Sequence, residues 1–123
     1  MPILTIEFVH EPGELPPENA PREIANLAGE IFATPAGQTW VRLRLLGKAS
    51  YTENGMSPAE TPSPVFVSVL KRSLDNPEQL VAESKSLAKG IGDVFSRPTE
   101  NVHIEFEPAG AGRIAFGGEL STS

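Results

Sequence analysis

Apolar and polar positions follow one another along the chain in an order that predicts the same structural unit twice. Residues 2–9, PILTIEFV, are mostly apolar or β-branched and predict a strand, and a loop rich in proline and glycine follows it. From Pro21 onward the apolar residues recur at the helical spacing of i, i+3, i+4 and i+7, at Ile24, Leu27, Ala28 and Ile31. Residues 39–47, TWVRLRLLG, then alternate as a strand does, with one face made by Val41, Leu43 and Leu45. The first half of the chain therefore predicts a β-α-β unit.

The second half repeats the pattern after a connection rich in proline and serine. Residues 64–72, PVFVSVLKR, predict a strand. A helix is predicted after Asn76, which is a good N-cap, because Pro77 suits the first helical position and Gln79 can return the capping hydrogen bond. The predicted apolar face of this helix consists of Leu80, Ser84, Leu87, Ala88, Ile91 and Phe95. Residues 101–107, NVHIEFE, predict the last strand, and the glycine-rich tail PAGAGRIAFGG predicts a turn.

Two β-α-β units with right-handed crossovers predict an α+β fold with a four-stranded mixed sheet and two antiparallel helices on one face. The predicted single domain spans residues 1–123, with pseudo-repeats at 2–60 and 64–120. The uncovered face of the sheet would carry polar and charged side chains next to Trp40, namely Arg42, Arg44, His103, Glu105 and Glu107. This mixture suits neither a monomer core nor a fully wetted surface, so it predicts an oligomer that closes the sheets on one another.

Composition narrows the possible functions. The 16 acidic and 10 basic residues give a net charge of −6, which disfavours a nucleic-acid partner. The chain has no cysteine and two histidines, so a disulfide framework and a thiolate metal site are excluded, and a dedicated histidine metal cluster is not expected. No basic leader followed by an apolar run is present, and no stretch nears the roughly 18 apolar residues of a membrane span. We therefore expect a cytoplasmic protein, with no membrane partner, whose chemistry is metal-free or uses a borrowed metal.

Pro2 is the first candidate for chemistry. Methionine before a residue as small as proline is normally removed, which would leave a free secondary amine at the start of a strand. An α-amine has a pKa of about 8 in the reference state, and an apolar pocket or nearby cations lower that pKa. An amine of this kind is a usable general base near neutral pH. The alternative is a purely structural role, in which Pro2 weakens strand-edge pairing, and the sequence leaves both roles open.

The strand-opening proline, the duplicated β-α-β unit and the glycine-rich tail together resemble the tautomerase superfamily in its two-repeat form of roughly 120 residues. The most specific stretch is NVHIEFEPAGAGRIAFGGEL, which resembles the end of the short 4-oxalocrotonate tautomerase subunits. The resemblance implies a homotrimer that acts on a small 2-oxo or enol carboxylic acid as a cofactor-independent tautomerase or isomerase, with Pro2 as general base. Two alternatives stay open: a hydratase, dehalogenase or decarboxylase that uses protonated Pro2, and a non-catalytic trimeric binding protein.

The resemblance also implies further catalytic residues. Arg42 matches a carbonyl-polarising arginine of 4-oxalocrotonate tautomerase. His103 occupies the equivalent place in the second repeat, where the inhibitory-factor branch has a tyrosine, and Glu105 stands at that branch's asparagine. An alternative role for Arg42 and Arg44 is a ladder of ion pairs with acidic residues of a neighbouring subunit, Glu105 and Glu107.

Substrate-binding residues follow from the same comparison. Arg72 resembles a carboxylate-binding arginine after the third strand of the cis-dehalogenase branch, and Lys71 would reinforce it. That branch has a second arginine three residues later, where this chain has Asp75, so dehalogenation is disfavoured. The apolar wall of the site is expected from Ile114, with Phe116 close by.

Overall fold

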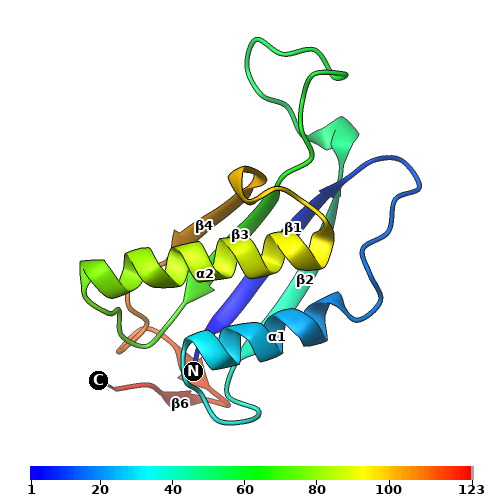
Figure 1. Ribbon diagram of the computed structural model, residues 1–123. Coiled ribbons are helices and arrows are strands. Elements are labelled where there is room, and N and C mark those ends of the chain that lie inside the picture. The colour runs from blue at the N-terminus through cyan, green and yellow to red at the C-terminus, as the bar shows by residue number, and fades with distance from the viewer. Residues whose placement is uncertain (123) are drawn as a thin grey trace.

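A four-stranded sheet with two helices across one face forms the body of the molecule (Figure 1). This computed structural model describes residues 1–122, and Ser123, the last residue of the predicted domain, lies outside that range. The strands are β1 (Ile3–His10), β2 (Trp40–Gly47), β3 (Val65–Leu70) and β4 (Val102–Phe106), and the helices are α1 (Ala20–Ile31) and α2 (Pro77–Phe95). Single 3₁₀ turns lie at Lys48–Ser50 and Thr99–Asn101, and a small tail hairpin joins β5 (Ala115–Phe116) to β6 (Glu119–Leu120).

The sheet has the order β2-β1-β3-β4 and combines both kinds of strand pairing. β1 pairs with β2, and β3 with β4, in parallel, as two β-α-β units require. The two units join through the antiparallel pair of β1 and β3 at the centre of the sheet. The helices run antiparallel to each other in Figure 1. The predicted α+β fold with a duplicated β-α-β unit is therefore confirmed.

The core lies between the sheet and the two helices, because alternate residues of the central strands point toward the helices. Its fully buried strand residues are Leu4, Ile6, Phe8, Val65, Val67 and Val69. The helices pack onto them through Ile24 and Ala28 of α1 and through Leu87, Ile91 and Phe95 of α2. The helices approach each other closely at Gly90, where a Cβ atom would overlap the side chain of Leu27.

The second helix begins as the sequence predicts. The Asn76 side chain accepts a hydrogen bond from the Gln79 backbone N–H at 2.9 Å, and Pro77 occupies the first turn. On the buried side of this helix the structure adds a charged residue that the apolar pattern did not include, because Glu83 is only 3% exposed. Burial of a carboxyl group is costly unless partners compensate it, so Glu83 marks a specific electrostatic arrangement.

The first strand pair departs from the predicted pattern at Leu45. This side chain was predicted to face the core, yet it is 49% exposed. The reason is that β2 is an edge strand with a single neighbour, β1, so its far end lacks the cover that the central strands receive.

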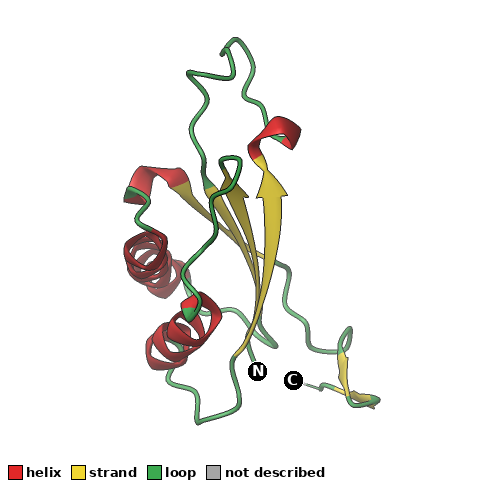
Figure 2. Ribbon diagram, turned by 90° about the vertical axis from the view of Figure 1, so that its right-hand side faces the viewer, coloured by secondary structure: helices red, strands yellow, loops and turns green. Residues whose placement is uncertain are grey.

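The face of the sheet opposite the helices is uncovered within one chain, as the side view in Figure 2 shows. In the same view the tail hairpin lies on this open side, near the start of β1. Among residues 1–122, no helix combines the length and the apolar character needed to cross a membrane.

Candidate active site

Pro2 is buried at the start of the central strand β1. Its carbonyl oxygen accepts a hydrogen bond from the Trp40 backbone N–H at 3.0 Å, which fixes it against β2. On the other side, Ile3 pairs with Leu70 of β3, so Pro2 lies beside the point where β3 ends. The sheet therefore holds the backbone at Pro2 from both sides.

The glycine-rich tail folds over the same end of the sheet. The backbone N–H groups of Gly110 and Ala111 donate to the carbonyl oxygens of Lys71 and Arg72 at 2.8 and 3.0 Å. A Cβ atom at Gly110 would lie 3.3 Å from the Lys71 oxygen and 3.1 Å from a methyl group of Ile114, so this close approach favours glycine. The contact directs the chain back toward the N-terminus.

An aromatic contact completes this end of the molecule. The rings of Trp40 and Phe116 meet edge to face with their centroids 5.3 Å apart, while the Trp40 indole N–H donates to the Gly37 carbonyl oxygen at 2.9 Å. Trp40 thus contacts both the Pro2 backbone and the tail hairpin. The sequence placed Trp40 on the open face of the sheet but assigned it no part in the site.

A cavity of about 340 Å³ lies at the N-terminus between the end of β3 and the tail hairpin. We call it the N-terminal cavity; its lining residues are Met1, Arg72, Phe116, Glu119, Leu120, Ser121 and Thr122. It brings together three features that the sequence selected separately: the N-terminus, Arg72 and Phe116. Glu119 and Leu120 were not predicted, because they reach the cavity only through the hairpin.

The surroundings of the N-terminus disfavour a positive charge on its amine. Burial, and then the positive charges of Arg72 and Lys71, lower the pKa of the Met1 α-amino group below its ordinary value. The two cations have different surroundings, although they are adjacent in the chain just after β3. Arg72 lines the N-terminal cavity, whereas the Lys71 ammonium lies 2.7 Å from Asp75 and 3.5 Å from Glu83 of α2.

Arg42 lies in a different cavity, on the open face of the sheet. Its guanidinium donates to the Thr5 hydroxyl oxygen at 2.9 Å, and it lines a hollow of about 620 Å³. Ile114 and Arg44 belong to the same hollow. In one chain, Arg42 and Ile114 are therefore neighbours of each other and do not line the N-terminal cavity.

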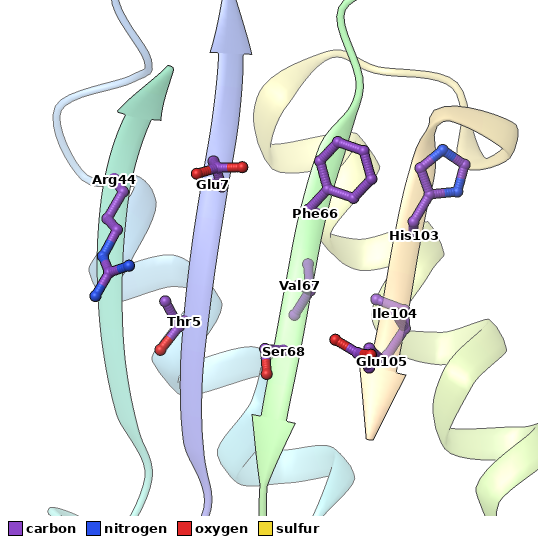
Figure 3. Close-up of a pocket in the computed structure, with 9 residues that line it drawn as sticks. All are labelled: Thr5, Glu7, Arg44, Phe66, Val67, Ser68, His103, Ile104 and Glu105. Atoms are coloured by element: carbon purple, nitrogen blue, oxygen red, sulfur yellow. The ribbon is translucent and has the colours of Figure 1, made fainter. Parts of the chain in front are cut away.

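His103 and Glu105 lie in a third hollow, of about 420 Å³, on the open face (Figure 3). In that view the side chains lie along all four strands, with Arg44 on β2 at one edge and His103 and Glu105 on β4 at the other. His103 is level with Phe66 of β3, which is level with Glu7 of β1. Five residues of strand, or roughly 16 Å, therefore separate the level of His103 from Pro2. Within a single chain the structure does not bring Pro2, Arg42, His103 and Glu105 into one site.

The arrangement at the N-terminal cavity suits proton transfer next to a carboxylate. It offers an amine of lowered pKa, one guanidinium that can bind a carboxylate through two hydrogen bonds, and an aromatic wall. Within residues 1–122, no group of three or more histidine, aspartate or glutamate side chains converges as a metal site would require.

Several solved structures share this fold. Macrophage migration inhibitory factor from Oncomelania hupensis superposes with a TM-score of 0.77 at 20% identity, over 98% of this chain and 83% of that one. Pt0534 inactivated by 2-oxo-3-pentynoate gives 0.80 at 16% identity, and the symmetric trimer of Q0 fused 4-OT gives 0.79 at 11%, each over 97% of this chain and 94% of the other. No protein-family model and no curated protein sequence matches the chain.

These likenesses confirm the predicted resemblance to the tautomerase superfamily at the level of the fold. The identities of 11 to 20% establish the architecture and leave activity and substrate to be inferred from the site.

Proposed function

We propose that this protein is a cofactor-independent tautomerase or isomerase of a small 2-oxo or enol carboxylic acid. In this proposal Met1 is removed, and the Pro2 amine is the general base. The observation that carries the proposal is the N-terminus itself. Burial and two cations lower the pKa of the Met1 α-amine, which adjoins Pro2 and borders a cavity with Arg72 and Phe116. A neutral amine accepts a proton, so this environment favours the base over a role that needs protonated Pro2.

The reaction needs only proton movements. Arg72 binds the carboxylate of an enol acid, and the neutral Pro2 nitrogen takes the proton of the enol hydroxyl group. The resulting ammonium returns a proton to the carbon at position 3, which gives the 2-oxo acid and restores the amine. No atom is gained or lost in the cycle, so no cofactor takes part. The guanidinium also stabilises the negative charge that develops on the enolate.

The lining of the N-terminal cavity indicates which acids fit. Arg72 supplies one carboxylate partner, while Phe116 and Leu120 provide apolar surface for the rest of the molecule. Glu119 places a carboxylate of the protein in the same cavity, and like charges repel. These features support a monocarboxylate with an apolar body, such as phenylpyruvate, over a dicarboxylate.

Chemical labelling tests the proposal directly. We expect 2-oxo-3-pentynoate, the reagent that inactivates Pt0534, to abolish phenylpyruvate turnover and to modify the Pro2-initiated peptide. The adduct mass should equal the peptide plus one whole reagent molecule, because conjugate addition of an amine to an alkynone expels nothing. Mass spectrometry of the N-terminal peptide, before and after labelling, measures both Met1 removal and modification. Turnover that persists after complete labelling of Pro2 would contradict the proposed base.

We further propose that the chain assembles as a trimer. Q0 fused 4-OT forms a symmetric trimer with this fold. The open face is also electrically polarised, because β2 carries Arg42 and Arg44 whereas β4 carries Glu105 and is followed directly by Glu107. Opposite edges of one sheet that attract each other favour head-to-tail contacts, and such contacts form a ring when the rotation between subunits closes. The arrangement supports the predicted ladder of ion pairs between neighbouring subunits.

Sedimentation tests the trimer. We expect a mass three times the 13.2 kDa of one chain. Arg44→Glu should shift the protein toward monomer, since it places like charges against the neighbouring β4. The double reversal Arg44→Glu with Glu105→Arg is the matched control and should restore the trimer. A wild-type mass of one chain would refute the assembly.

A further inference from the structure

A charged cluster lies on the helix side of the sheet, next to the N-terminus but outside the N-terminal cavity. It consists of Lys71, Asp75 and Glu83, and we call it the Lys71 cluster. The Lys71 ammonium is 2.7 Å from Asp75 and 3.5 Å from Glu83. It also lies 4.5 Å above the ring of Phe32, the C-cap residue of α1. Contacts from α2 and from the end of α1 therefore restrain the Lys71 ammonium group.

The register of the sheet places the cluster directly behind Pro2. Ile3 pairs with Leu70 in the antiparallel pair of β1 and β3, so Pro2 and Lys71 are the next residues along the two strands. Both lie on the helix side, because Leu4 and Val69 point there and alternate residues share a face. Lys71 is consequently a close cation of the N-terminus that does not line the cavity where a substrate would bind.

The cluster holds Lys71 in a fixed position. The Lys71 side chain is 13% exposed, and the Glu83 side chain is 3% exposed. Among the described residues, Glu83 Oε1 has no hydrogen-bond partner, so this carboxyl group is buried at a cost that packing alone does not explain. Burial and the neighbouring Asp75 raise the pKa of Glu83, whereas the hydrogen bond from Lys71 lowers the pKa of Asp75. Asp75 is thus the partner that stays ionised most readily.

We propose that Lys71 is a positioning residue for the N-terminal base, held by Asp75 and Glu83 as a fixed charge behind Pro2, while Arg72 is the cation that contacts the substrate. This inference rests on the proposed function, since it assigns the Pro2 amine the role of base. It separates two adjacent cations by their surroundings. Arg72 lines the N-terminal cavity and acts by contact, whereas Lys71 lies in the cluster and acts through space. The negative charge of Asp75 partly offsets the positive charge of Lys71 and so sets how strongly Lys71 lowers the pKa of the amine.

The electrostatic consequences have opposite signs for the two partners. The charged groups around the amine come from four segments. They are Lys71 and Arg72, which follow β3, Asp75 of the loop after them, Glu83 of α2 and Glu119 of the tail. Without the Lys71 charge the ammonium form is easier to keep, so the pKa of the amine rises. Without the Asp75 charge, the positive field of Lys71 is offset within the cluster by Glu83 alone, so the pKa of the amine falls. The two substitutions therefore shift the pKa of the amine in opposite directions.

The test is the pH dependence of two reactions of the Met1-free protein. In phenylpyruvate turnover, kcat/KM should rise with pH as the amine loses its proton. We expect Lys71→Met to move this rise to higher pH and Asp75→Asn to move it to lower pH. KM at high pH should stay within about twofold in both variants, because neither residue contacts the substrate. Lys71→Arg, which keeps the charge, should retain the wild-type profile.

The second reaction is labelling of the amine by 2-oxo-3-pentynoate, whose rate also follows the neutral amine. It reports the pKa of the amine even if phenylpyruvate is not turned over. If the wild type does not turn over phenylpyruvate but the labelling profiles shift as expected, the proposed function is refuted and the Lys71 assignment is supported. Labelling profiles that coincide in all variants, or shift in the same direction, would overturn the assignment. So would a large rise in KM for Lys71→Met, which would make Lys71 a substrate ligand. Asp75 lies in an exposed loop, so Asp75→Asn provides the test if Lys71→Met fails to fold.

Discussion

Removal of Met1 from protein that retains it should raise kcat/KM for phenylpyruvate tautomerisation at least about a hundredfold. While Met1 is attached, the Pro2 nitrogen is part of an amide and has no basic lone pair. After removal it is a secondary amine, and a positioned general base contributes about 10² to 10⁴ in rate. Met1-bearing protein treated with methionine aminopeptidase provides the measurement, because intact mass and activity can be followed in the same sample.

Two controls define what this experiment tests. Protein that already begins at Pro2 should show no change in rate after the same treatment. Pro2→Ala, also freed of Met1, keeps an amine at the same place but loses the ring that fixes its direction. We expect a loss of about tenfold or more for this variant, since misplacement of a reacting group by a small distance is costly. Equal rates before and after Met1 removal would exclude the N-terminal amine from the mechanism.

The fold could be predicted because its determinants are local. Each strand and helix carries its own periodicity, and two β-α-β units leave few possible arrangements. The tail shows where the interpretation stopped short, because a predicted turn is a hairpin between β5 and β6. Gly117 and Gly118 adopt positive φ angles of 59° and 87°, as tight hairpin turns require. The paired glycines between Phe116 and Glu119 were a signal for that hairpin.

The site was harder to predict because it depends on where each side chain points. The sequence assigned Lys71 and Arg72 to the same substrate, and in the structure the two residues have different surroundings. Arg72 lines the N-terminal cavity, whereas Lys71 contacts Asp75 and Glu83. Glu83 is spaced three residues after Leu80 and four before Leu87, so helical periodicity also placed it on the apolar face. Within one chain the register of the sheet keeps His103 away from Pro2, and the pattern of one chain does not define how the subunits of the proposed trimer would meet.

Arg72→Gln should raise KM for phenylpyruvate about 10- to 100-fold, with a smaller effect on kcat. Arg72 is the cation that lines the N-terminal cavity, and a guanidinium binds a carboxylate through two charge-assisted hydrogen bonds. Hydrogen bonds to charged groups contribute about 1.5 to 3 kcal/mol, which corresponds to that range of affinity. Steady-state kinetics of the Met1-free variant, at a pH where the amine is neutral, provides the measurement.

Arg42→Gln is the matched control, because Arg42 bonds to Thr5 in a different hollow of the same chain. We expect a change in KM of less than about threefold. A larger effect for Arg42 than for Arg72 would place the carboxylate against the open face of the sheet, where assembly could bring Arg42 to the Pro2 of a neighbouring subunit. The two arginines would then exchange the roles assigned here.

Glu119→Gln extends the same test to substrate choice. Glu119 and Arg72 line one cavity, so the glutamate should repel a second carboxylate without preventing the first from binding. We expect the variant to gain about tenfold in kcat/KM for the enol of a 2-oxo dicarboxylate and to change little toward phenylpyruvate. A variant that loses activity on both acids would show that Glu119 supports the hairpin and does not select the substrate. If kcat/KM for a dicarboxylate falls in Arg72→Gln and rises in Glu119→Gln, both charges lie close to the bound acid.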